Sequence, residues 1–207
     1  MIILPLLILF VLFLPLLFIF MFFNIITISF VKLGIPRGAV LFLFCFCLVG
    51  SLINIPVWHA MPSTPSPFYF HPPDVSAPVI AVNVGGCIVP SVIALYLLRK
   101  APLAKTAIAT ALIIGLAYWL AKPVPGVGIQ MPFFVAPIAS AVVALILTRG
   151  RNAAPVAYIS GVFGTLIGAD LLHLSALETG GFQVLSIGGA GVFDGIFLTG
   201  IIAAFLS

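Results

Sequence analysis

The chain alternates between long apolar runs and short, more polar connections. A helix needs about 20 predominantly apolar residues to cross the hydrocarbon core of a bilayer. Seven runs approach or exceed that length: 3–30, 39–58, 78–98, 103–120, 132–148, 154–174 and 186–206. Within lipid, a helix satisfies its own backbone hydrogen bonds and an open strand does not. The pattern therefore predicts an all-α, polytopic transmembrane helix bundle of about seven spans in a single domain, residues 1–207.

The first apolar run is the longest, and we expect it to be retained as a tilted first span. It lacks the basic n-region and the small-residue cleavage site of a signal peptide, and it extends too far, from Met1 to Phe30. Pro5 and Pro15 are the expected positions of kinks within it.

Composition agrees with a chain that is solvated mainly by lipid. Hydrophobic residues make up 63% of the sequence and charged residues only 6%, whereas a soluble domain carries about 25% charged residues. We therefore predict a multi-pass protein of the cell membrane whose partner is the lipid bilayer. The net charge of +4 is spread between the apolar runs without forming a patch, so nucleic-acid binding is not expected. Cys45, Cys47 and Cys87 lie inside apolar runs and are expected to pack as small apolar residues.

The basic residues predict the orientation of the spans. Seven of the eight lie in or beside three alternate connections, 31–38, 99–105 and 149–153, whereas the other connections contain only Lys122. Cytoplasmic loops carry an excess of Lys and Arg. We therefore expect these three connections and the C-terminus to be cytoplasmic, and the N-terminus to be external.

Two of the other connections have an unusual composition. The connection at 59–77 is rich in proline, which excludes a regular helix and favours an extended chain. We interpret it either as a stiff connector or as a lid that gates the external face. The connection at 121–131 is also rich in turn-forming residues.

Two acidic residues fall inside predicted spans, where an ionisable group is costly and therefore suggests a function. Asp170 lies four residues from the external end of the sixth span, and Asp194 lies eight residues from the start of the seventh. At 1.5 Å per residue, these positions are roughly 6 and 12 Å below the external surface. We expect both carboxyl groups to lie in one polar chamber in the outer half of the bundle.

Further polar residues gather on the same side. Asn54 is close to the external end of the second span, and Asn83 is close to the external start of the third. On ideal helices, each asparagine shares a face with small residues, an arrangement that permits close approach and interhelical hydrogen bonds. His173 follows Asp170 by about one helical turn. Three more polar residues fall at or beyond the external ends: His59, His71 and Asp74. The cytoplasmic half of the spans is close to featureless by comparison.

Glycines indicate both close contacts and breaks in the helices. Gly164 and Gly168, and likewise Gly191 and Gly195, form GxxxG pairs, which in apolar helices usually indicate close packing. Asp170 lies about 200° around an ideal helix from Gly168. We therefore expect the acid to face a cavity among spans two, three and seven while the glycines pack elsewhere. The glycine-rich start of the seventh span is expected to be interrupted, as in discontinuous transporter helices.

Four strings carry a resemblance to a known family: GSLINIP at 50–56, VNVGG at 82–86, GTLIGADLL at 164–172 and SIGGAGVFDGIFLTG at 186–200. Together they resemble a prokaryotic family of multi-pass membrane proteins, the domain of unknown function 1614. The resemblance covers most of spans two to seven. It implies a membrane protein and brings no assigned activity with it.

The acid pair also resembles, more distantly, the catalytic pair of GxGD-type intramembrane aspartyl proteases, which are presenilin-like or signal-peptide-peptidase-like. Those enzymes place one Asp on each of two adjacent helices, and a Gly-x-Gly string precedes the second. Here Gly-Ala-Gly at 189–191 precedes Asp194, with two residues between them. This resemblance implies that Asp170 and Asp194 act together as a catalytic dyad on a membrane-embedded substrate.

The leading functional hypothesis is transport or binding of a small solute, including proton-coupled transport. Buried acids, asparagines and broken glycine-rich helices are typical of coupling-ion and substrate sites. The expected binding residues are Asn54, Asn83, Asp170, His173 and Asp194. The alternative is an intramembrane diaspartyl hydrolase, in which one carboxyl group acts as a base and the other as an acid. In that case Asp170 and Asp194 are the catalytic residues.

A second alternative is a metal-dependent membrane enzyme. Asp170 and His173 would share a helix face and ligate one ion. Asp194 and either His59 or His71 would complete that site. Because the sequence lacks a His-x-x-x-His pair, we predict no metal site, and we predict no cofactor. In the remaining, purely structural interpretation, the acids hydrogen-bond to neighbouring helices and serve packing. The sequence leaves the substrate and the oligomeric state open.

Overall fold

Helices make up most of the chain in the computed structural model, which describes residues 3–59, 79–124, 128–174, 184–189 and 193–207. The α-helices are α1 (Ile3–Lys32), α2 (Arg37–Gly50), α3 (Val89–Leu97), α4 (Leu103–Leu120), α5 (Val135–Thr148), α6 (Ala153–Thr165) and α8 (Gly195–Leu206). Shorter turns of other pitch are the π-helical η1 (Val84–Ile88) and η2 (Leu166–Asp170) and the 3-10 helix η3 (Leu171–His173). The predicted helical character is therefore confirmed.

Several of the described helices are apolar, and some of them have the length of membrane helices. Three are long and apolar enough to cross a membrane: Phe10–Lys32, Leu103–Leu120 and Ala153–His173. Four shorter apolar helices accompany them: Arg37–Gly50, Val84–Leu97, Val135–Thr148 and Gly195–Leu206. Large apolar side chains such as Phe42 and Trp119 are exposed, at 71% and 78%. Lipid tails solvate such a surface, whereas water does not.

A three-stranded sheet occurs where continuous helices were predicted. Its strands are β1 (Asn54–His59), β2 (Val79–Asn83) and β5 (Val184–Ile187), in the order β1-β2-β5. β1 pairs antiparallel with β2, and β2 pairs parallel with β5. The prediction of helix is therefore wrong in three places, where the chain forms strands: the end of 39–58, the start of 78–98 and the start of 186–206.

The local sequence explains why these segments leave the helix. Pro56 lacks an amide hydrogen and disfavours helical geometry in the residue before it, so α2 cannot continue through it. The β2 segment contains two valines and an isoleucine, whose branched side chains favour strands. The three strands then satisfy one another's backbone groups. The connection at 59–77 lies outside the described residues beyond His59.

A short hairpin forms the described part of the connection at 121–131. β3 (Lys122–Val124) pairs antiparallel with β4 (Gly128–Gln130). The segment from Met131 then leads into α5. This hairpin agrees with the turn-forming composition of the connection.

The helix α6 is the centre of the bundle, because every one of its residues except Phe163 is buried. It approaches α4 through glycines. A Cβ on Gly164 would overlap the side chain of Ile113, and a Cβ on Gly168 would overlap the carbonyl oxygen of Ile114. The close packing predicted for this GxxxG pair is therefore confirmed.

Glycines also bring α6 and α8 together. A Cβ on Gly161 would lie 3.1 Å from the Thr199 side chain, and a Cβ on Gly200 would lie 2.6 Å from the Val162 side chain. The second predicted GxxxG pair behaves differently. A Cβ on Gly195 would meet nothing within 4 Å, and Gly191 lies outside the described residues.

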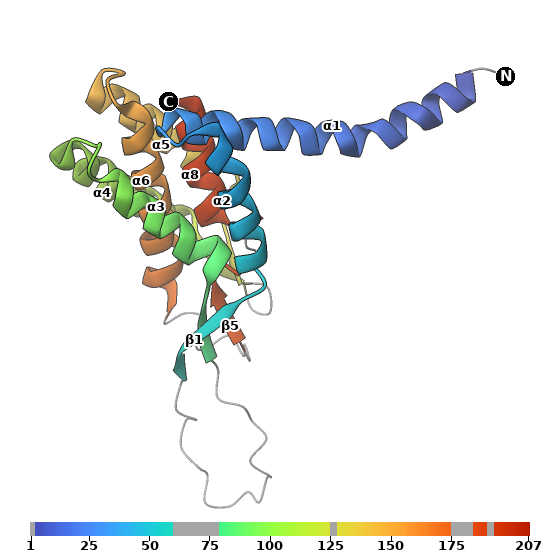
Figure 1. Ribbon diagram of the computed structural model, residues 1–207. Helices are drawn as coiled ribbons and strands as arrows, with labels where there is room; N and C mark the ends of the chain where they lie inside the picture. Colours follow the sequence, from blue (N-terminus) through green and yellow to red (C-terminus); the bar gives the residue numbers. More distant parts are fainter. Residues whose placement is uncertain (1–2, 60–78, 125–127, 175–183, 190–192) are drawn as a thin grey trace, which may run out of the picture.

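The basic connections lie together at one end of the bundle, at the top of Figure 1 and opposite the sheet. The Lys100 ammonium group donates to the Leu33 carbonyl oxygen at 3.1 Å, and the Asn152 amide donates to the Lys100 carbonyl oxygen at 3.4 Å. These hydrogen bonds tie the α1–α2, α3–α4 and α5–α6 connections to one another. The C-terminal end of α8 lies at the same end.

The first helix departs from the direction of the others. α1 leaves the bundle at a steep angle to α2, and residues 10–21 are exposed (Figure 1). One face of its last turns is buried, with Ile26 and Phe30 in the main apolar core, and Leu33 just after the helix joins the same core. The predicted first span is therefore a long helix, but its N-terminal half does not run alongside the bundle.

The close approach of α6 and α4 generates a prediction for Gly168→Ala. The added Cβ would overlap backbone at Ile114 and lie 2.9 Å from the Cβ of Ala117. Overpacking of this kind costs about 1–3 kcal/mol, so we expect a lower Tm for the detergent-solubilised protein. Gly115→Ala on α4 is the matched control, because its Cβ meets nothing within 4 Å. Alanine is also the better helix former by about 1 kcal/mol. A Gly168→Ala protein as stable as the control would contradict the described packing.

Candidate functional site

Asp170 lies where the central helix changes its pitch. α6 passes at Thr165 into the π-helical turn η2, which ends at Asp170, and the 3-10 turn η3 follows. Turns of π-helix inside α-helices are rare and frequently occur at functional sites. The Thr165 hydroxyl donates to the Gly161 carbonyl oxygen at 2.7 Å, within the helix itself. The half-buried Asp170 side chain is thus presented at an irregular helix end.

Asp194 begins α8 rather than lying inside it. Its backbone is extended, and its Oδ1 atom accepts a hydrogen bond from the Ile196 amide at 2.9 Å. Asp is favoured at this capping position, because it satisfies an otherwise unpaired amide and faces the positive end of the helix dipole. The predicted span 186–206 begins eight residues before Asp194, whereas α8 itself begins at Gly195, directly after it. The interruption expected in the glycine-rich segment before it is present, since β5 ends at Ile187.

The two acids line a single cavity of about 180 Å³, which we call the acid cavity. Its walls come from the end of α6 with η2, from the start of α8, and from the segment between β4 and α5. The described lining residues are Ile129, Met131, Phe133, Thr165, Ala169, Asp170, Asp194, Gly195, Ile196, Leu198 and Thr199. Span seven lines the acid cavity, as expected, whereas its described lining includes residues 129–133 and no residue of spans two and three.

The acid cavity combines two carboxyl groups with a mostly apolar wall. Two hydroxyl groups, from Thr165 and Thr199, and the thioether of Met131 are its other polar or polarisable side-chain groups, and the described lining contains no basic residue. A pair of like charges in a partly buried site is costly unless a cation or a proton offsets it. At about 30 Å³ for each water molecule, the volume of about 180 Å³ suits a small occupant.

The asparagines form a separate hydrogen-bonded network. Asn83 is fully buried, and its Nδ2 group donates to the Ser51 carbonyl oxygen at 2.8 Å and to Asn54 Oδ1 at 3.0 Å. Its Oδ1 atom accepts from the Gly86 amide at 2.9 Å. The Ser186 hydroxyl also donates to Asn54 Oδ1, at 2.5 Å. This network fastens the three strands to the turn η1.

The positions of Asn54 and Asn83 differ from those predicted. Asn54 is the first residue of β1 and Asn83 is the last of β2, so the shared helical faces expected for them are wrong. Neither residue belongs to the described lining of the acid cavity. Because both side-chain groups of Asn83 already have protein partners, the geometry supports a positioning role for it.

His173 lies behind the wall of the acid cavity. Its Nδ1 atom is 2.9 Å from the carbonyl oxygen of Ala169, a lining residue. Its ring packs against Tyr118, with ring centroids 4.9 Å apart. Among the described residues, no group of three His, Cys, Asp or Glu side chains is arranged to hold a metal ion. His71 and Asp74, which were expected near the external ends, lie outside the described residues.

Comparison with known proteins identifies a family and no activity. A family model described as "Protein of unknown function (DUF1614)" matches residues 48–206. The match includes both acids, the three strands and the helices from α3 to α8. No curated protein and no solved structure matches the chain.

The asparagine network generates a prediction for Asn83→Ala. The change removes three hydrogen bonds, one buried and two partly buried, and leaves the Ser51 carbonyl and the Gly86 amide without this partner. A buried polar group without a partner costs about 1–3 kcal/mol, so we expect a fall in Tm of several degrees. Ser51→Ala is the matched control, because it keeps the backbone carbonyl and removes only a hydroxyl that bonds within its own helix. Equal Tm values for the two variants would refute the positioning role.

Proposed function

The chain belongs to the DUF1614 family of proteins of unknown function, and we propose that it is a multi-pass cell-membrane protein that binds and transports a small cation or proton through the acid cavity. One observation carries the proposal. Asp170 and Asp194 line the same cavity of about 180 Å³, and its described lining contains no basic residue.

Electrostatics favours a cationic occupant. Ionisable groups at membrane depth are expensive, and where they occur they mark ion and proton pathways. A bound cation lying between the two carboxyl groups offsets both the repulsion between them and the loss of their hydration. The hydroxyl oxygen of Thr199 lies in the same wall and is of the type that hard cations prefer.

Broken helices support transport over a purely structural role. Transporter sites are typically built where membrane helices are discontinuous, because the freed backbone and the helix ends then face the substrate. Asp170 ends a π-helical turn and Asp194 caps the start of α8. A pair of acids that served only packing would not require two such breaks beside one cavity.

An intramembrane diaspartyl hydrolase is the second candidate, because it too needs two carboxyl groups facing one space. The size of the acid cavity argues for the small occupant. A hydrolase must admit an extended peptide segment together with a water molecule, and about 180 Å³ is close to the volume of six water molecules. A metal-dependent enzyme is less well supported, because His173 is not part of the described lining and its Nδ1 atom lies 2.9 Å from the carbonyl oxygen of Ala169.

We further propose seven spans, with the basic end in the cytoplasm. The cluster of seven basic residues at that end supports the orientation, because cytoplasmic connections are enriched in Lys and Arg. The acid cavity then lies toward the external side, beside the sheet. A cation entering from outside would reach it without crossing the basic end.

The proposal predicts the effect of removing either charge. We expect proteoliposomes containing the wild-type chain to conduct protons or an alkali cation, and Asp170→Asn and Asp194→Asn each to lower that flux at least tenfold. Both changes preserve shape, and Asn is as good a helix cap as Asp. Lys122→Gln is the control, because it alters one charge at the same end of the bundle outside the described lining of the acid cavity.

Two outcomes would contradict the transport proposal. One is a wild-type flux no greater than that of protein-free liposomes for protons, Na⁺ and K⁺. The other is a flux that both Asn variants retain. Cleavage of a membrane-spanning reporter that is lost in both variants, without any flux, would instead support the hydrolase.

The proposed orientation predicts opposite labelling of two engineered cysteines. A membrane-impermeant maleimide added to intact cells should label Lys122→Cys, and it should label Arg151→Cys only after permeabilisation. The wild-type chain is the background control, since its cysteines lie in apolar segments. The reverse pattern would overturn the proposed orientation.

A further inference from the structure

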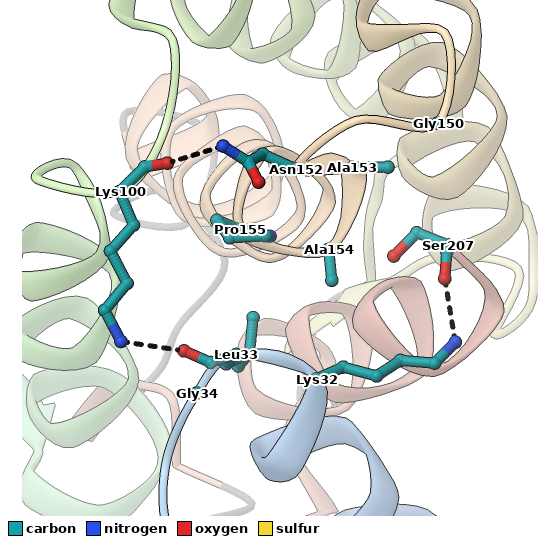
Figure 2. Close-up of a pocket in the computed structure, with 10 residues that line it drawn as sticks. All are labelled: Lys32, Leu33, Gly34, Lys100, Gly150, Asn152, Ala153, Ala154, Pro155 and Ser207. Atoms are coloured by element: carbon teal, nitrogen blue, oxygen red, sulfur yellow. Dashed lines mark hydrogen bonds between the residues drawn. The ribbon is translucent and has the colours of Figure 1, made fainter.

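A second pocket, of about 620 Å³, lies at the basic end of the bundle, and its described lining shares no residue with that of the acid cavity. It is bordered by the end of α1, the α3–α4 turn, the α5–α6 turn, the start of α6 and the end of α8. Figure 2 shows Lys32 and Lys100 on opposite sides of it, with Ala154 and Pro155 between them. We call it the basic pocket.

The ammonium groups of Lys32 and Lys100 donate hydrogen bonds to backbone carbonyl oxygens, and these bonds do not use all of their N–H donors. Lys32 Nζ donates to the carbonyl oxygens of Phe205 and Ser207, at 2.6 and 2.7 Å. Lys100 Nζ donates to the Leu33 carbonyl oxygen at 3.1 Å. An ammonium group has three donors, so one donor of Lys32 and two of Lys100 form no hydrogen bond to these carbonyl oxygens. Lys32 Nζ also lies 5.8 Å from the centre of the Phe205 ring, and Lys100 Nζ lies 5.2 Å from that of Tyr96. Capping of the C-terminal ends of α8 and α1 thus uses only some of the N–H donors of these two lysines.

The start of α6 adds a third source of positive potential. Its first residues, from Ala153 to Pro155, line the basic pocket. Asn152 stands at its N-cap with a left-handed backbone, φ 56°, and among the described residues no side chain caps the first turn. The amides of a helix start and the positive end of its dipole form a ready site for an anion, phosphate above all.

The charge balance around the basic pocket is one-sided. Its described lining contains two lysines and no acidic residue. Arg37, Arg99, Lys105, Arg149 and Arg151 belong to connections at the same end of the bundle, and all four acidic residues lie elsewhere in the sequence. The described lining therefore offers an anion positive side chains and no negative one.

Because Gly34 has no side chain, the Lys100 ammonium group has room to lie against the connection between α1 and α2. A Cβ there would lie 2.8 Å from Lys100 Nζ, and the backbone φ of +77° suits glycine alone. The connection between α1 and α2 can therefore pass close to the ammonium group without covering its remaining donors.

From the pocket, its lysines and the uncapped helix start, we infer that the basic pocket binds the phosphate group of an anionic ligand. Its volume exceeds that of a bare phosphate and accommodates a phosphoglycerol-sized group. Two sources offer this chemistry: the headgroup of an anionic phospholipid in the adjacent leaflet and a soluble phosphate ester. Basic pockets between membrane helices on the cytoplasmic side characteristically hold lipid headgroups. This inference does not depend on the function proposed for the acid cavity.

The test compares pocket variants with a variant of the same charge outside the pocket. The full chain in detergent is titrated with short-chain phosphatidylglycerol, with glycerol 3-phosphate and with inorganic phosphate, and binding is read by the rise in Tm. Lys100→Gln is expected to weaken binding about tenfold, the typical effect of losing a charge-assisted hydrogen bond. Lys105→Gln, at the same end but outside the pocket lining, should change binding less than twofold.

A second variant separates binding from folding. Asn152→Asp keeps a residue that tolerates the left-handed backbone. It loses the 3.4 Å amide bond to the Lys100 carbonyl oxygen, but it places a negative charge at the positive end of the α6 dipole, so its Tm without ligand should change little. The added negative charge should nevertheless weaken phosphate binding at least tenfold. Binding of the lipid alone assigns the pocket to a headgroup, and binding of glycerol 3-phosphate or phosphate assigns it to a soluble ester. No binding of any probe, or equal binding by Asn152→Asp and Lys105→Gln, would overturn the inference.

Discussion

The close approach of α6 to α4 and α8 is the constraint on which the rest of the bundle depends. Gly161, Gly164 and Gly168 bring these backbones so near one another that a single added Cβ would crowd or overlap the neighbouring helix. Lipid tails are as apolar as leucine, so burial alone does not drive helices together in a membrane, and close packing of small residues must do so. With α6 fixed in this way, its irregular end places Asp170 against the same cavity as the cap of α8.

Breaks in the helices, rather than regular helix faces, hold the polar residues. Asn83 ends β2 and opens the π-helical turn η1, Asp170 ends η2, and Asp194 opens α8. Each break frees backbone groups that must find partners inside an apolar protein. Asn83 and Asp194 supply those partners through their own side chains. A bundle of uninterrupted helices would have buried the same acids without providing the space that they line.

The sequence predicted the regular part of the fold better than its breaks. The runs at 103–120 and 132–148 correspond closely to α4 and α5, because each apolar run is bounded by connecting segments. Pro137 falls in the first turn of α5, where proline is tolerated. The strands were not predicted, because hydropathy does not distinguish a short apolar strand from a short apolar helix. In addition, the strands that pair lie far apart in the sequence. Ile80, for example, pairs with Leu185. Only Pro56 signalled locally that α2 could not continue.

The charged residues of the candidate site could be predicted from the sequence, whereas the other residues that line the cavity could not. An acid inside an apolar run is visible in the sequence, and so is the asymmetry of the basic residues. Met131 and Phe133 reach the acid cavity only through the tertiary path of the segment after β4, and no local pattern indicates that path. The basic pocket was missed for the same reason, since its lysines come from connections that are distant in sequence and meet only at the end of the folded bundle.

The central claim is that the two carboxyl groups act on one occupant of one cavity. A double-mutant cycle of cation affinity tests it most directly, with affinity taken from the concentration dependence of flux in the wild type, Asp170→Asn, Asp194→Asn and the double variant. Groups that share a ligand show coupling of about 0.5–3 kcal/mol, whereas independent sites are additive to within about 0.5 kcal/mol. We expect the double variant to lose little more affinity than either single variant. Fully additive losses would show that the two acids do not share an occupant.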